Sequence, residues 1–496
     1  MSALADAIAR SFTAAEPERP AVSPLRALGR RRLSGPQVLA QSVGTTGCAA
    51  SMVLLPITLL HYGTPLSSAL TLLGAVLMTF LIAVCITQFT RRQAAAGGLY
   101  SFVFQGLGAR AALSAGVALL VKYVGSATAT LYSGGQALML ALAAVGVPVG
   151  GVLGTLAVYL AIAASVLAVL VRGARVAALA MLAVEACSLA FIVVLTVLPG
   201  TAGPPPPPGG APHGTLHIAL SALFSLAGFE SATFFGPESR RPLASVTRVV
   251  LLTPLLCGGL FLFAGWAAWT GRGASVLAAA TDGAGSGVAT PVVLALNLGL
   301  ACSWLASATA SSHAASRLVY SMGVERLLPR FAAAVHPRFR TPHLALVVIV
   351  TGVAVAGTAL ALGLAPAREH LVQVVRAMVV TAYALVAVAS VRFLCRIREQ
   401  TAPAVAAGWA VAVAGVGLLG ALVVVEPLES DYPVSAIVVA LLASGLGWWW
   451  VLRRRPSALR RMGVFDATES ADVLPGAGVF GPDASGAVVL VGRRAG

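Results

Sequence analysis

Apolar stretches of membrane-spanning length recur along this chain, separated by short polar segments. A helix needs roughly 20 apolar residues to cross a hydrocarbon core of ~30 Å. Of the 496 residues, 58% are hydrophobic and only 10% are charged, which is too few charges to cover a water-soluble surface. The sequence therefore predicts an all-α integral membrane protein.

Each apolar stretch is interpreted as one transmembrane helix, which gives about 12 spans. We place them at residues 37–60, 66–88, 112–137, 149–171, 176–198, 216–237, 248–269, 289–315, 343–364, 371–391, 403–424 and 433–452. Residues 92–108 are Gly-rich and amphipathic, which predicts a short interfacial helix in the loop after the second span.

The formal net charge of +16 comes from arginines with an uneven distribution. They occupy the N-terminal arm, the even-numbered loops and the tail, whereas odd-numbered loops hold only Arg272 and Arg368. This is the positive-inside pattern, which predicts that both termini are cytoplasmic and argues against nucleic-acid binding. The arm shows no signal peptide. The strong preference for Arg over Lys is typical of a high-GC bacterium, so we expect a multi-pass protein of the cytoplasmic (inner) membrane.

The cysteines favour neither disulfides nor zinc, because all six lie in or beside spans and none forms a CxxC pair. Enzyme signatures such as HExxH, a GxSxG elbow or a P-loop do not occur. The sequence thus predicts neither an enzyme nor a protein with a metal or organic cofactor.

Two predicted spans are interrupted by helix-weakening residues. The first contains "SVGTTGCAAS" (42–51), and the sixth contains Ser225 to Gly228 and then Gly236-Pro237. Breaks five spans apart are typical of an inverted five-helix repeat, with a ligand site where the breaks face each other. The predicted segments are an arm (1–36) and a tail (453–496), both largely disordered, repeat halves 37–198 and 216–391, a Pro-rich outer loop 199–215, and two further helices in 392–452.

The broken helices supply the predicted substrate site. Free N–H groups at half-helix N-termini suit a carboxylate, and free carbonyl groups suit an ammonium, so an amino acid satisfies both. The residues at the two breaks are Thr45, Thr46, Gly47, Cys48, Ser225, Ala227 and Gly228.

Ionisable residues inside spans are costly and mark candidate functional positions. Glu230 follows the sixth-span break and is a candidate proton-exchanging group, or else a structural acid. Lys122, the only lysine, begins a polar stripe with Ser126 on the third span. It either faces substrate or pairs with Glu185 or Glu230. Glu185 in the fifth span is a second candidate for coupling, with a structural ion pair as the alternative.

Three motifs resemble those of the amino acid–polyamine–organocation (APC) permeases. "FSLAGFESATFFGPESRRP" is similar to their sixth-helix signature, "AASRLVYSMGVERLLPRFAAAVHPRFRTP" to the eighth helix and its following loop, and "AAAGGLYSFVFQGLG" to the loop after helix two. The resemblance covers roughly residues 35–450. It implies the LeuT-like five-plus-five fold with two extra helices, and transport of amino acids or related amines by proton coupling or exchange.

The resemblance also implies roles for particular residues. Phe224 takes the position of an aromatic lid over the substrate, and Glu230 that of a gating acid. A lysine at Lys122, where cation-transporting relatives carry an acid, implies a substrate that is not strongly cationic. Ser307 and Ser311 on the eighth span could ligate sodium, or could form a small-residue seam between helices. His313 replaces a common Asn, and Ala49 replaces a Gly of the first break.

The sequence therefore predicts a secondary active transporter that works by alternating access, with protons favoured over sodium as the coupling ion. An amino-acid sensor or a channel-like protein that keeps the fold is the alternative. The expected partners are a small-molecule substrate and the lipid bilayer.

Overall fold

The computed structural model of the protein describes residues 27–29, 31–147, 149–197, 203, 213–429, 434–466, 479–482 and 488–491. Twelve segments in this part of the chain are long and apolar enough to cross a membrane. The all-α fold predicted from the sequence is confirmed. The Pro-rich loop from Pro204 to Pro208 lies outside the described residues.

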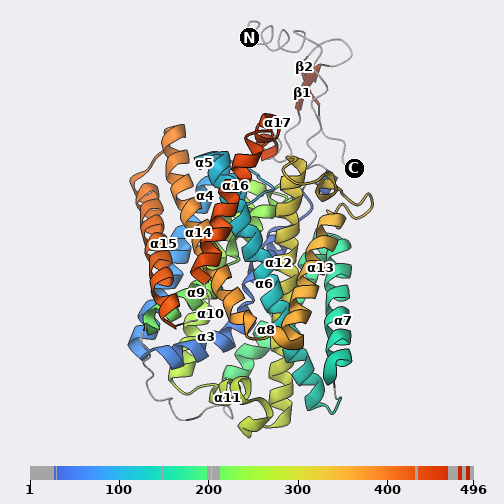
Figure 1. Ribbon diagram of the computed structural model, residues 1–496, viewed down its shortest axis with the longest axis vertical. Coiled ribbons are helices and arrows are strands. Elements are labelled where there is room, and N and C mark those ends of the chain that lie inside the picture. Colours follow the sequence, from blue (N-terminus) through green and yellow to red (C-terminus); the bar gives the residue numbers. More distant parts are fainter. Residues whose placement is uncertain are drawn as a thin grey trace.

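The long helices run in both directions through one bundle (Figure 1). They are α2 (Gly35–Thr46), α3 (Cys48–Tyr62), α4 (Pro65–Thr90), α6 (Ala109–Ala144), α7 (Gly151–Val171), α8 (Ala174–Val197), α9 (Gly214–Leu226), α10 (Thr247–Trp269), α12 (Thr290–Val324), α13 (His343–Ala359), α14 (Ala367–Ile397), α15 (Ala402–Glu429) and α16 (Val434–Leu452). Several extend beyond the predicted spans, because an apolar window detects the part in the hydrocarbon core and misses polar end turns.

Short elements connect or continue the long helices. They are the helices α5 (Leu99–Leu107), α11 (Ala274–Asp282) and α17 (Pro456–Leu459), the 3-10 helices Phe229–Glu238, Gly283–Ser286, Arg330–Ala333 and Val464–Asp466, and the π-helical turns Pro242–Val246 and Leu360–Leu364. The strands β1 (Val479–Pro482) and β2 (Val488–Val491) pair antiparallel within the predicted disordered tail. Figure 1 shows α11 at one end of the bundle and α5 and α17 at the other; we call these the α11 end and the α5 end.

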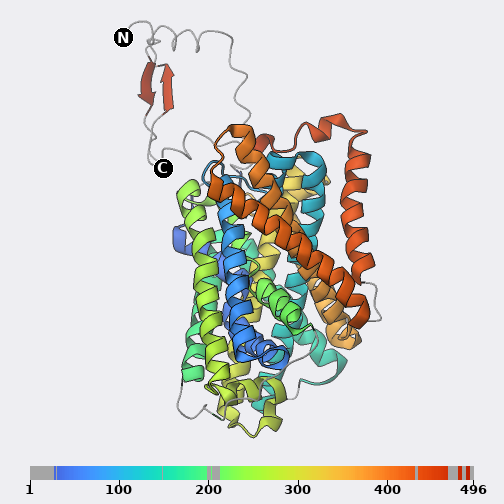
Figure 2. The same ribbon diagram turned by 90° about the vertical axis from the view of Figure 1, so that its left-hand side faces the viewer.

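Each of the first four spans packs against the span five places later in the chain. The broken first span contacts the sixth, α4 contacts α10, α6 contacts α12, and α7 contacts α13. A two-fold relation between two five-helix halves brings equivalent helices together in this way. The helices α15 and α16 lie outside these halves, and Figure 2 shows α15 crossing one face of the bundle obliquely.

Apolar side chains cover the outside of the bundle as well as its core. Leu66, Leu153 and Val413 are exposed by more than two thirds of their surface, at 70%, 82% and 69%. Such a surface is suited to lipid and not to water. The predicted interfacial helix is present as α5, but it packs against α14, and Tyr100 and Phe102 on it are buried.

Candidate functional site

The first span breaks at Gly47. This residue has a left-handed backbone with φ of 58°, which ends α2 at Thr46 and starts α3 at Cys48. In a continuous helix the Ala49 N–H would donate to the Thr45 carbonyl group. Instead the Ser307 hydroxyl group donates to that carbonyl at 3.0 Å, and the Ala49 N–H donates to Glu185 Oε1 at 2.9 Å.

The eighth span supplies a second capping group at the same break. The Ala50 N–H donates to Ser303 Oγ at 3.1 Å. Serines 303 and 307 lie one turn apart on α12, so one face of this helix satisfies two of the freed backbone groups. The serine spacing noted in the sequence thus has a structural role at the break.

The sixth span breaks at Ala227 and Gly228. Helix α9 ends at Leu226, Ala227 is extended, and Gly228 has φ of 124°, a conformation that disfavours any other residue. A Cβ on Gly228 would lie 2.7 Å from Thr45 Cγ2, and Thr45 Oγ1 lies 2.9 Å from Ser231 Oγ. The two breaks therefore touch each other through Thr45 and Gly228, and both predicted discontinuous helices are confirmed.

Glu230 is fully buried, and four donors surround its carboxylate. Lys122 Nζ and the Tyr123 hydroxyl group each donate to Oε1 at 2.7 Å. The Gly228 N–H donates to Oε2 at 2.9 Å and the Tyr383 hydroxyl group at 2.8 Å. The sequence leaves Glu185 and Glu230 open as partners of Lys122, and in the structure Lys122 forms its ion pair with Glu230. Because this ammonium is neutralised in place, Lys122 no longer supports an inference about the charge of the substrate.

Glu185 is a residue of α8, and its carboxyl group lies in a different environment, beside the start of α3. Its Oε1 accepts from the Ala49 N–H and from the Ser303 hydroxyl group at 3.1 Å. Its Oε2 is buried without a hydrogen-bond partner in the described part of the chain, and Lys122 is paired elsewhere. A buried carboxyl group with no cationic partner can take up a proton or bind a cation.

The other predicted site residues are spread around the breaks. Thr46 Oγ1 lies 3.6 Å from Cys257 Sγ on α10, and Cys48 lies beside the same cysteine. Ser126 is buried on α6, and Ser225 is half-buried near the end of α9. Ser311 is buried on α12, and its Oγ has no partner among the described residues.

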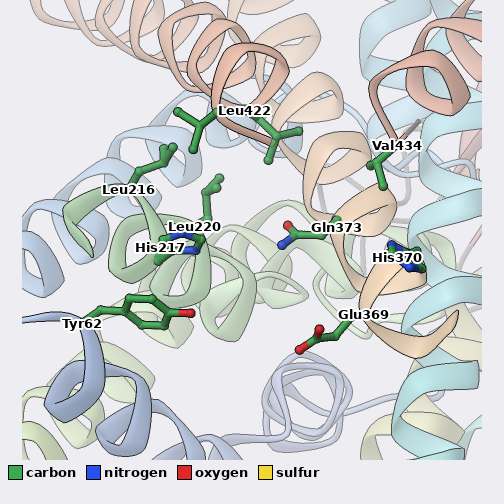
Figure 3. A pocket seen from close by; sticks show the side chains of 10 residues that line it. Tyr62, Leu216, His217, Leu220, Glu369, His370, Gln373, Leu422 and Val434 are labelled. Carbon is green, nitrogen blue, oxygen red and sulfur yellow. The ribbon is translucent and has the colours of Figure 1, made fainter. Parts of the chain in front are cut away.

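Two adjoining cavities lie between the breaks and the α11 end, and together we call them the outer hollow. The inner one has about 120 Å³ and is lined by Ala129, Thr130, Ser133, Phe224, Trp304, Arg368, Glu369, Val372 and Gln373. The second has about 380 Å³ and shares Glu369 and Gln373 with the first. Tyr62, His217, Gln373 and Glu369 point into a common space there (Figure 3). Its volume is in the range of small-ligand pockets.

Of the predicted site residues, Phe224 is the one that lines the outer hollow. Thr130 and Ser133, which continue the polar stripe of the third span, line it too, and the other lining residues are not among the predicted site residues. The charge pattern assigns Arg368 to an outer loop, whereas the structure has it in the first turn of α14. The two tyrosines on Glu230 carried no sequence signal, since Tyr123 and Tyr383 are 260 positions apart and read as ordinary core residues.

Two larger cavities, of about 640 and 670 Å³, lie along α8 and α12. They are lined almost entirely by apolar side chains, and helices α7 and α8 bear many exposed apolar residues. Lipid chains fit such grooves better than a polar solute does, so the candidate site is the outer hollow with the breaks beneath it.

A bundle with two broken helices in contact, beneath a polar cavity open toward one end, defines a membrane transporter. The amino acid permease family model matches residues 37–449, and the chain belongs to this family. A 149-residue region is 32% identical to an uncharacterized transporter of Rhizobium meliloti (strain 1021). That match covers 28% of this chain and 31% of the relative, so the chain spans about a third of the relative's length.

Proposed function

We propose that this transporter moves amino acids across the cytoplasmic membrane by alternating access. The observation that carries the proposal is the contact between the two breaks at Thr45 and Gly228, directly below a polar hollow. Backbone groups at such breaks can bind a zwitterion, and half-helices joined by glycine can rotate about the junction. Substrate would enter from the α11 end, which we assign to the outside.

The α5 end supports this direction of entry, because it is closed in this structure. Arg317 Nη1 lies 2.9 Å from Glu238 Oε1, and both side chains are buried. The backbone before α2 is held to the same place, since the N–H groups of Arg32 and Leu33 donate to the Glu238 carbonyl group at 2.7 and 2.9 Å. In the transport cycle this group of contacts would have to open while the outer hollow closes.

Gly228→Ala tests the role of the break, with Gly259→Ala as the matched control. A Cβ at Gly228 would be strained and would clash with Thr45, whereas one at Gly259 meets nothing within 4 Å. We expect uptake of a mixture of radiolabelled amino acids into proteoliposomes to fall on the order of tenfold or more for the first variant only, since strain of this kind costs about 1–3 kcal/mol. Equal uptake by both variants would contradict a mechanism that depends on the break.

For coupling we propose protons, with Glu185 as the carrier. One oxygen of Glu185 lacks a hydrogen-bond partner among the described residues and the other caps the start of α3, whereas every donor around Glu230 supports a structural role for that acid. Proton loss from Glu185 would therefore change the charge next to the start of α3, at the break of the first span.

Uptake driven by an imposed pH gradient distinguishes the two acids. We expect Glu185→Gln to abolish accumulation against a concentration gradient while counterflow exchange continues, because the substrate site survives and the proton carrier does not. Glu230→Gln should lower both activities together. If Glu230→Gln alone abolished pH-driven accumulation and left exchange intact, Glu230 and not Glu185 would be the proton carrier. Stimulation of wild-type uptake by sodium at constant pH would reject proton coupling.

A further inference from the structure

Arg368 of α14 lines the inner cavity of the outer hollow, and Arg376 lies behind its lining, against Phe224 and Gln373. The hydrogen-bond partners of both arginines are uncharged. Arg368 Nη2 donates to Ser133 Oγ at 3.3 Å, and Arg376 Nη2 donates to Ser221 Oγ at 3.1 Å. The Nε atoms of both are buried without a partner, and neither arginine forms an ion pair within the described part of the chain. Each guanidinium group therefore keeps donor capacity for an anion.

The two arginines lie at different depths. They are eight residues apart, which is about 12 Å along a helix. Arg368 stacks over the Tyr132 ring with its Cζ 5.9 Å from the ring centroid, in the first turn of α14 near the α11 end. Arg376 stacks over Phe224 at 5.7 Å, and Phe224 is two residues before the end of α9. Arg368 thus lines the inner cavity, and Arg376 lies about two helical turns deeper, beside Phe224.

The outer hollow as a whole favours a negative group. Among the described residues that line it, Glu369 is the one carboxylate, and it faces both cavities. With Arg368 and Arg376 beside it, the charge of these three side chains sums to about +1. An organic ammonium ion without a carboxylate would meet net repulsion on this route, whereas a zwitterion would place its carboxylate on an arginine and its ammonium toward Glu369.

We propose that the outer hollow is a carboxylate-binding subsite on the substrate route, with Arg368 and Arg376 as its cationic groups. The substrate class is then amino acids that keep their α-carboxylate, to the exclusion of the corresponding amines. This inference rests on the proposed function and deepens it, since the family resemblance by itself implies amino acids or amines.

Matched ligand pairs test this directly. Each common amino acid is paired with the amine left by removing its α-carboxylate, such as leucine with isoamylamine, and both are titrated in thermal-shift measurements on the purified full chain. We expect one or more amino acids to raise the melting temperature and their amines to have no effect. Arg376→Gln and Arg368→Gln should each weaken the protecting amino acid by tenfold or more, and Arg376→Lys should weaken it less. Arg272→Gln, at the α11 end but outside the hollow, should have no effect.

Protection by amines as strong as by their amino acids, protection by neither class, or unchanged affinity in the double variant Arg368→Gln/Arg376→Gln would overturn the inference. Melting without ligand shows whether each variant is folded, and Arg376→Lys keeps the test decisive if the Gln variant is not. Uptake into vesicles separates the two proposals. Accumulation of amines would support transport but contradict the carboxylate-binding subsite. Carboxylate-dependent binding without accumulation would support the subsite but contradict transport.

Discussion

Glu230 shows how much of this site is decided by single side chains. A carboxylate with no exposed surface requires compensation by both charge and hydrogen bonds, and Lys122, Tyr123 and Tyr383 provide it from α6 and α14. These three contacts with Glu230 therefore fix the backbone just after Gly228 to α6 and α14. These contacts hold the backbone of the broken sixth span in place, whereas Glu185 has no cationic partner among the described residues and one of its oxygens accepts no hydrogen bond there.

Removing one member of the Lys122–Glu230 pair should be worse than removing both. Lys122→Met leaves an uncompensated buried carboxylate, and losses of about 3–5 kcal/mol are typical of this change. The double variant Lys122→Met/Glu230→Gln should recover part of the loss, because an uncharged amide oxygen can still accept from Gly228 and Tyr383 while its NH2 group donates to the Tyr123 hydroxyl oxygen. Melting temperatures in detergent for the four members of the cycle measure the coupling. Strictly additive losses would show that the two charges do not interact.

At the scale of elements, the turn after the last span is fastened to the α5 end of the bundle. The Gly463 N–H donates to Glu325 Oε1 at 2.7 Å, while the Tyr100 hydroxyl group donates to Oε2 at 2.6 Å. Asp466 is buried in the same turn, and a Cβ on Gly463 would clash with Phe104 of α5. Part of the predicted disordered tail thus has a defined contact with α5 and with the residue after α12.

This contact should depend on pH. Burial, with a smaller effect of the Asp466 charge, raises the pKa of Glu325 from 4.5 to about 7. Burial also raises the pKa of Asp466 from 3.8 to about 6. The docked turn therefore binds more protons than a released one. Its stability is fully present below the ordinary pKa values of the two carboxyl groups, 4.5 and 3.8, and is lost as pH rises through about 6 to 7.

Hydrogen exchange of residues 456–466 measures this release. After correction for intrinsic rates, we expect stronger protection at pH 5 than at pH 8. Glu325→Gln should reduce the difference, with Asp466 left to titrate, because the amide still accepts from Gly463 but carries no charge. Equal protection at the two pH values in the unmodified protein would contradict the pKa shifts.

For the whole molecule, the distribution of arginines predicts how the bundle sits in the membrane. Loops at the α5 end carry the basic clusters, so this end should face the cytoplasm. Thr281 in α11 and Thr401 before α15 are exposed at opposite ends. In whole cells a membrane-impermeant maleimide should label Thr281→Cys, and should label Thr401→Cys only after permeabilisation. Native cysteines lie in spans, so the unmodified protein gives the background, and the opposite labelling pattern would invert the assigned topology.

The sequence by itself determined the spans, the family resemblance and the positions of both helix breaks. These features depend on local composition, because membrane-crossing helices must be long and apolar, and glycine at Gly47 and Gly228 permits backbone angles that other residues avoid. Such features can be recognised without knowing which residues lie close together in the folded protein. Lys122, Glu185 and Glu230 were recognisable for the same reason, since charge at that depth is rare.

Only the tertiary structure decided what each of these groups contacts. Lys122 had two possible acids, and helix packing chose Glu230 and left Glu185 at the first break. The outer hollow combines α3, α6, α9, α12, α14, α15 and α16, whose lining residues are up to 372 positions apart in the chain, from Tyr62 to Val434. Pairing and cavity shape depend on which helix faces approach each other in space, and no local pattern in one chain records that.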